Sequence, residues 1–94
     1  MIFKENYKIK RQSGGEVSLL IKIDEPYKNK EFFYVDVYLD GLIENLPPIG
    51  GPSKMRAIEN SFIFVRELMH GFVAKGNTVY LVGSNGILEV AYFD

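Results

Sequence analysis

The sequence predicts an α+β protein: a five-stranded, largely antiparallel sheet with one long helix packed on one face, in the order β-β-β-α-β-β. Three observations predict this fold. Apolar and polar residues alternate in the N-terminal half, apolar residues recur every three or four positions in the middle, and an Asn-Gly pair separates two apolar runs near the end. The 94 residues, 47% of them hydrophobic, suffice for a single domain spanning 1–94.

Three strands are expected before the helix, because apolar residues occupy every second position in three runs. The inward-facing residues are Phe3, Tyr7 and Ile9 in the first run, Val17, Leu19, Ile21 and Ile23 in the second, and Phe33, Val35, Val37 and Leu39 in the third. A three-residue loop at 13–15 would join the first two strands, pairing Tyr7 with Ile21 and Ile9 with Leu19. Residues 26–30 are expected to form the turn into the third strand.

The middle of the chain predicts a helix with a wide apolar face that lies across the sheet. Two neighbouring stripes form this face: Met55, Ile58, Phe62, Val65, Met69 and Phe72 in one, and Ala57, Ser61, Phe64 and Leu68 in the other. Pro52 is suited to the first helical position, and Gly51 or Ser53 can cap it. Gly71 or Gly76 can end the helix.

The stretch NLPPIGGPS, residues 45–53, precedes this helix and raises the question of a ligand-binding loop. It lacks the Gly-Lys-Ser/Thr ending of a phosphate-binding P-loop and the spacing of a dinucleotide-binding loop. We therefore interpret it as a turn into the helix. The alternative is anion binding at the helix amino end, assisted by Lys54 and Arg56.

The residues after the helix predict a β-hairpin across 78–93. Asn85-Gly86 favours a two-residue turn in which both residues have positive φ. This turn would pair Gly83 with Leu88, Leu81 with Val90 and Val79 with Tyr92 on one face. Tyr80, Val82, Ile87, Glu89 and Ala91 would then lie on the opposite face.

Composition narrows the function mainly by exclusion. The net charge is −1 and the chain has no cysteine, which excludes disulfides, thiolate catalysis and cysteine-ligated metals. The N-terminus has no apolar run of signal-peptide length, and no segment is apolar enough to span a membrane. We expect a cytoplasmic protein that requires no cofactor.

Catalytic and metal-binding patterns are not found in the sequence. The single histidine, His70, falls on the polar face of the helix near its C-terminal end, and no second histidine exists to form a metal pair. Asp36 and Asp40 share a strand face but lie roughly 13 Å apart at strand rise, beyond the separation of glycosidase carboxylates. We expect neither an enzyme nor a metal site.

The outer face of the third strand is the predicted binding surface. Tyr34, Asp36, Tyr38 and Asp40 alternate there, and the last hairpin adds Tyr80. Tyrosines beside carboxylates are suited to protein contacts, since each ring offers rigid apolar area and the acids can meet Arg or Lys. The alternative is an ordinary solvated sheet face, where tyrosine is common.

Four lysines form a basic group on the same side of the predicted sheet: Lys4, Lys8, Lys10 and Lys22. Such a group with nearby aromatics can bind single-stranded nucleic acid. We expect instead that the lysines protect an edge strand from pairing with other chains, and do not expect nucleic-acid binding.

Short meandering strands, a Gly/Pro/Ser entry, the helix SKMRAIENSFIFVRELMHG and a closing hairpin together resemble small uncharacterised bacterial domains and toxin-immunity proteins. The resemblance is architectural and carries over no functional residue. It implies a non-enzymatic protein-binding module, an immunity-type inhibitor whose partner is a basic toxin or effector. The alternatives are a small-molecule binder with a pocket near the Pro/Gly loop, and a homo-oligomeric structural domain.

Overall fold

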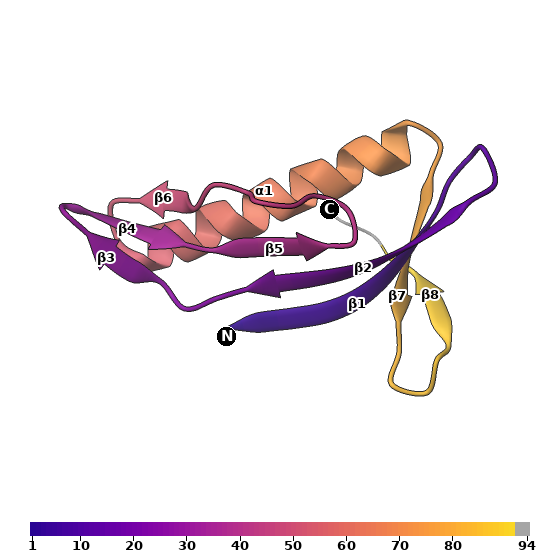
Figure 1. Cartoon of the computed structure of the whole chain (residues 1–94), viewed down its shortest axis with the longest axis horizontal. Helices are drawn as coiled ribbons and strands as arrows, with labels where there is room; N and C mark the ends of the chain where they lie inside the picture. Colours follow the sequence, from indigo (N-terminus) through magenta and orange to yellow (C-terminus); the bar gives the residue numbers. More distant parts are fainter. Residues whose placement is uncertain (92–94) are drawn as a thin grey trace.

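The computed structural model describes residues 1–91 and confirms the α+β fold (Figure 1). The elements are β1 (Phe3–Lys10), β2 (Glu16–Ile23), β3 (Tyr27–Asn29), β4 (Phe32–Val35), β5 (Val37–Asp40), β6 (Ile49–Gly51), α1 (Lys54–Ala74), β7 (Thr78–Val82) and β8 (Leu88–Val90). Five strands form an antiparallel sheet in the order β5-β2-β1-β7-β8. A second, unpredicted antiparallel sheet has the order β3-β4-β6.

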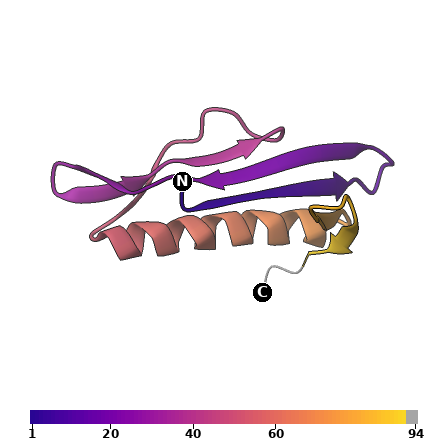
Figure 2. The same ribbon diagram turned by 90° about the horizontal axis from the view of Figure 1, so that it is seen from below.

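The helix forms a layer of its own on one side of the strands. Figure 2 shows α1 running along the length of β1 and β2, which lie together on one side of it. The molecule is elongated, with principal extents of 45 × 28 × 24 Å. No helix within residues 1–91 combines the length and the apolar character needed to cross a membrane.

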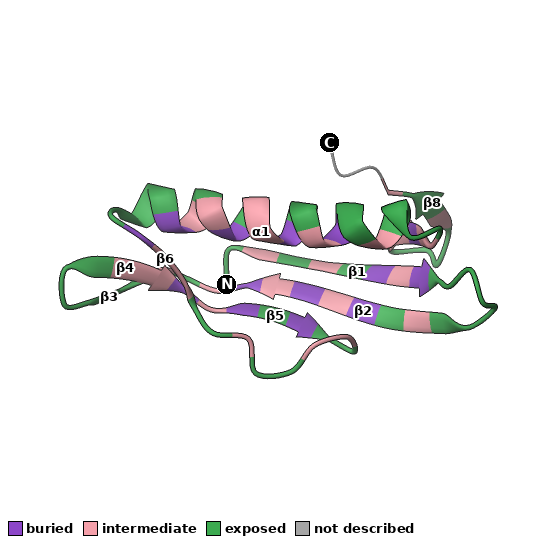
Figure 3. Ribbon diagram, turned by 90° about the horizontal axis from the view of Figure 1, so that it is seen from above, coloured by how far each residue is buried: buried purple, intermediate pink, exposed green. Residues whose placement is uncertain are grey.

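The core lies between the helix and the strands (Figure 3). Its helical part is a row with a spacing of four residues, Ala57, Ser61, Val65 and Met69, so it draws on both predicted stripes. Its strand part comprises predicted inward-facing residues that become buried: Tyr7, Ile9, Leu19, Ile21, Ile23, Val35, Val37, Leu39 and Val79. Met55 lies outside this layer, with 78% of its surface exposed.

The predicted third strand is one extended segment shared by two sheets. It breaks at Asp36, where β4 leaves the second sheet and β5 joins the first. The amide of Asp24 donates to the carbonyl of Asp36 at this point, at 3.0 Å. Pro26 lies between β2 and β3, and because it has no amide hydrogen it cannot donate to a strand ladder where the chain passes from one sheet to the other.

Residues 26–30 are not simply a turn, as predicted, because they contain β3. Tyr27 pairs with Tyr34 and Asn29 with Phe32, which leaves only Lys30 and Glu31 as the turn. Lys30 takes the positive φ, at 60°. The pattern of charged and polar residues in 26–30 concealed this short, exposed strand.

The Pro/Gly stretch forms a short strand and the cap of the helix. Ile49–Gly51 is strand β6, which pairs with β4 directly before the helix. Ser53 caps α1 by accepting a hydrogen bond from the amide of Arg56 at 3.1 Å. Pro52 therefore precedes the cap and does not occupy the first helical position, so that prediction is wrong. The helix ends at Ala74, and Gly76 follows its cap with φ of 92°.

The first hairpin has the predicted loop length but a different register. The loop is 12–14, and Tyr7 pairs with Leu19 and Ile9 with Val17, two residues away from the predicted partners. Gly14 adopts φ of 106°, the left-handed conformation that the last loop residue needs, while Gly15 belongs to the ladder. Because the shift is two residues, the inward face is unchanged.

The last hairpin has a three-residue loop, 84–86, so the predicted two-residue turn is wrong. Only Gly86 has positive φ, whereas the predicted turn needs it at Asn85 too. The side chain of Asn85 instead accepts the amide of Ile87 at 3.1 Å. Leu81 now faces Glu89, and the predicted pairing of Val79 with Tyr92 lies outside the described residues.

Strand β1 lies in the middle of the five-stranded sheet, paired with β2 and β7. The prediction that its lysines guard a sheet edge is therefore wrong. Lys8 and Lys10 instead lie 3.7 and 3.8 Å from the carboxylate of Glu16 on β2. These lysines are part of cross-strand ion pairs on the outer face.

We predict that Gly51→Ala destabilises the protein by about 1–3 kcal/mol, because β6 lies directly against the first turn of α1. A Cβ on Gly51 would come within 2.6 Å of the amide nitrogen of Ala57. Gly71→Ala is the matched control: that site is open, so the helix should gain about 0.5–1 kcal/mol. Urea unfolding checks both, and equal effects of the two substitutions would contradict the close contact.

Candidate functional site

The predicted contact residues of the third strand form a row along its outer face. Phe32, Tyr34, Asp36, Tyr38 and Asp40 alternate with the inward-facing positions across β4 and β5. The row continues through the break at Asp36, so it belongs to both sheets. We call these five residues, with Tyr27 of β3, the outer strip.

At the end of the outer strip formed by β3 and β4, the exposed side chains are aromatic. Phe32 is 51% exposed, and Tyr27 is 41% exposed. The Tyr27 and Tyr34 rings lie beside each other with centroids 6.1 Å apart. The Tyr27 hydroxyl donates to Asp36 at 3.4 Å. Desolvation of the phenol and the nearby Asp36 carboxylate raise the pKa of Tyr27, which keeps its hydroxyl protonated as the donor.

At the β5 end of the outer strip, a lysine from the neighbouring strand lies against the strip. Lys22 of β2 pairs with Tyr38, and its ammonium group lies 4.9 Å from the centre of that ring. The same ammonium lies 3.0 Å from the carboxylate of Asp40. Tyr38 and Asp40 thus already hold one cation, through a ring contact and an ion pair. Tyr38 remains 39% exposed.

Tyr80 is not part of this group, although it faces the same side of the sheet. β7 is three strands away from β5, about 14 Å at ordinary strand spacing. Lys8 pairs with Tyr80, and the ammonium of Lys10 lies 5.5 Å from its ring. The lysines of β1 and β2 therefore separate Tyr80 from the outer strip.

A shallow hollow of about 410 Å³ adjoins the outer strip. It is bounded by Asp36, Tyr38 and Asp40 on one side and by residues 43–46, including Glu44, on the other. The hollow borders the beginning of the Pro/Gly stretch at Asn45 and Leu46. Its rim carries three carboxylates, so a positively charged group is the chemistry that it accepts best.

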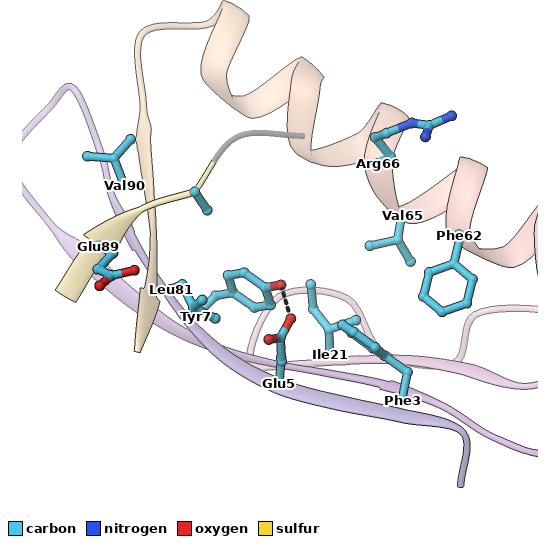
Figure 4. A pocket seen from close by; sticks show the side chains of 11 residues that line it. Phe3, Glu5, Tyr7, Ile21, Phe62, Val65, Arg66, Leu81, Glu89 and Val90 are labelled. Atoms are coloured by element: carbon cyan, nitrogen blue, oxygen red, sulfur yellow. Dashed lines mark hydrogen bonds between the residues drawn. The ribbon is translucent and has the colours of Figure 1, made fainter. Parts of the chain in front are cut away.

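A second concave site lies on the inner side of the sheet and was not predicted. A cleft of about 480 Å³ opens between α1 and strands β1, β7 and β8 (Figure 4). Apolar side chains make most of its wall: Phe3, Ile21, Phe62, Val65, Leu81, Val90 and Ala91. Phe3 and Phe62 meet edge to face, with centroids 5.4 Å apart.

The cleft contains a carboxylate on the core face of a central strand. Glu5 lies between Phe3 and Tyr7 in the inward-facing row, opposite Ile21. The Tyr7 hydroxyl donates to it at 2.5 Å. Burial raises the pKa of Tyr7, and the hydrogen bond and charge of Glu5 raise it further. The signal for this site was present in the sequence, because Glu5 interrupts an otherwise apolar inner row.

The positions of the histidine and of the acidic side chains bear on metal binding. Within residues 1–91, no three or more His, Asp or Glu side chains lie close enough to hold a metal ion. His70 is exposed near the end of α1. The two sites described above consist of exposed rings and carboxylates in the outer strip and a mostly apolar cleft beneath α1.

Comparisons with known proteins give no relative: no family model, curated protein or solved structure matches this chain.

We predict that Tyr7 makes the stability of the protein fall with rising pH above about pH 10. The unfolded phenol ionises near that pH, while the folded one keeps its proton to a higher pH. Unfolding therefore releases a proton in this range, and the free energy of unfolding declines by about 1.4 kcal/mol per pH unit. Below pH 10 the contribution is complete.

Urea unfolding of wild type and Tyr7→Phe over this alkaline range measures the effect. Lysines titrate in both proteins, so the difference between them isolates Tyr7. The free energy of unfolding should fall more steeply with pH in the wild type. Parallel declines would contradict the raised pKa.

Proposed function

We propose that this chain is a non-enzymatic protein-binding module, an immunity-type inhibitor that binds a basic toxin or effector in the cytoplasm. The observation that carries the proposal is the outer strip, a single row of aromatic and acidic side chains on one face of a strand. The strip is the contact surface in this proposal, and Tyr80 is a peripheral contact at most.

The exposure of the aromatic rings supports a protein partner. Phe32, Tyr27 and Tyr38 each expose more than a third of their surface to solvent. Large aromatic side chains dominate the binding energy of protein interfaces, because they bury much apolar area at little cost in conformational entropy. Packing of Tyr27 against Tyr34 orders two of these rings before any partner arrives.

The charge of the strip supports a basic partner. Asp36, Asp40 and Glu44 surround the hollow beside Tyr38. Of these three acids, Lys22 forms an ion pair with Asp40. An ion pair this exposed contributes about 0–1 kcal/mol to stability. An arginine or lysine of a partner can therefore compete with Lys22 for Asp40 at little cost, and can meet Asp36 and Glu44 as well.

We predict that Asp36→Lys/Asp40→Lys weakens binding of the partner by about 30-fold or more, because it replaces attraction with repulsion at the centre of the strip. The matched control is Glu59→Lys/Glu67→Lys on the exposed side of α1, which gives the same net charge. Immobilised wild type and both variants are used to capture proteins from a lysate of the native host. Circular dichroism verifies that each variant is folded.

The expected result is a basic protein retained by wild type and by the helix variant, released by moderate salt, and lost from the strip variant. Expression of the captured protein alone should arrest growth, and co-expression of the wild-type chain should restore it. Equal retention by the strip variant would reject the surface. A captured protein without toxicity would reject the immunity role while leaving the binding surface in place.

A further inference from the structure

We propose that the cleft beneath α1 binds a small apolar molecule that carries an ammonium group, with the carboxylate of Glu5 as its ionic partner. This site lies on the helix-covered side of the sheet and is separate from the outer strip. An arylalkylamine, in which an alkyl ammonium group is attached to an aromatic ring through a short chain, is the ligand class that its walls and charges fit.

The first argument is the position of Glu5. Glu5 is half-buried on the core face of a central strand, so its carboxylate is partly removed from water while it stays accessible from the cleft. A partly desolvated charge is stabilised by an ionic or hydrogen-bonding partner. Tyr7 supplies one hydrogen bond, whereas a carboxylate can accept about four. Within residues 1–91, which include every lysine and arginine of the chain, no ion pair involves Glu5.

The second argument is the charge around the cleft. Among residues 1–91, Glu89 is the other acid in its wall, and Arg66 is the one basic residue that lines it. Figure 4 shows the Arg66 guanidinium pointing away from Glu5. The described wall therefore presents negative charge toward the interior, which favours a cation and disfavours a carboxylate or phosphate.

The third argument is size and wall chemistry. A volume of about 480 Å³ is in the range of small-molecule sites, which are mostly apolar with a few polar groups. Phe3, Phe62 and Tyr7 provide aromatic surface beside Glu5. An ammonium group can donate to the carboxylate while the rest of the ligand contacts these rings, so one arylalkylamine satisfies both parts of the site.

The test is a titration of the isotopically labelled protein followed by its amide NMR shifts, with three probes of one shape. Phenethylamine is the cation, phenethyl alcohol is the neutral analogue, and hydrocinnamate is the anion. We expect saturable shifts at Phe3, Tyr7, Phe62 and Val65. Phenethylamine should bind at least about 10-fold more tightly than the alcohol, since a charge-assisted hydrogen bond is worth more than a neutral one. Hydrocinnamate should bind the least.

Two variants locate the selectivity. Glu5→Gln keeps the shape of the side chain and should remove the preference for phenethylamine over the alcohol. Glu89→Gln removes one negative charge from the same cleft and should keep most of that preference. Val65→Phe fills the cleft and should abolish binding of both probes. If Glu5→Gln does not fold, the comparison of the three probes on wild type still decides.

The proposal is overturned if amine and alcohol bind wild type equally, if the shifts map away from the cleft, or if no probe gives a saturable shift. It is also overturned if Glu89→Gln loses the preference as completely as Glu5→Gln does, since that result would indicate a general charge effect. None of these outcomes depends on the outer strip or its partner.

Discussion

One layer of apolar side chains between α1 and the two sheets is the interaction on which the structure depends. Its helical side is the row Ala57, Ser61, Val65 and Met69, all buried. Ala57 lies close to Gly51 of β6, and Ser61 satisfies its buried hydroxyl by donating to the carbonyl of Ala57 at 2.8 Å. Small residues at the helix start thus permit a short approach to β6, while Val65 and Met69 fill the wider space toward β7.

The shared strand makes this layer continuous. Val35 lies in the second sheet and Val37 in the first, yet both face the same core because the chain stays extended through Asp36. Because every second residue of that segment faces the core, the residues between them face outward and form the outer strip. Successive side chains of a strand point to opposite faces, so burial of the apolar positions places the aromatic and acidic residues between them on the outside. Glu5 is the exception on the inner side, and the cleft opens where it lies.

Sequence patterns predicted which residues face inward better than they predicted pairing. Alternation identified Leu19, Ile21, Val37 and Leu39 as core residues, since burial follows from side-chain periodicity alone. The registers of the two hairpins were harder to predict, because they depend on which residue of each loop takes positive φ. Gly14 rather than Gly15 does so in the first hairpin, and Gly86 without Asn85 in the last.

Tertiary features that were not predicted share a cause: they need partners distant in the sequence. β3 is short and mostly polar, β6 is short and contains two glycines, and both are strands only because they pair with β4. The central position of β1 follows from its pairing with β7, whose residues lie 68 to 74 positions later in the chain than their partners. In the candidate site, the row on β4 and β5 could be predicted from the alternation of one strand. The distance between that row and Tyr80, and the cleft around Glu5, could not be predicted, because both depend on how distant strands pair.

The most direct test of the central claim is native-state hydrogen exchange, which reports the free energy of opening at each amide. If one apolar layer holds helix and sheets together, the protected amides of Ser61, Val65 and Met69 should exchange with the same opening free energy as those of Ile21 and Leu39. Their values should also shift together when urea is added. A helix that opens at a distinctly lower free energy, while β1 and β2 stay protected, would contradict the account.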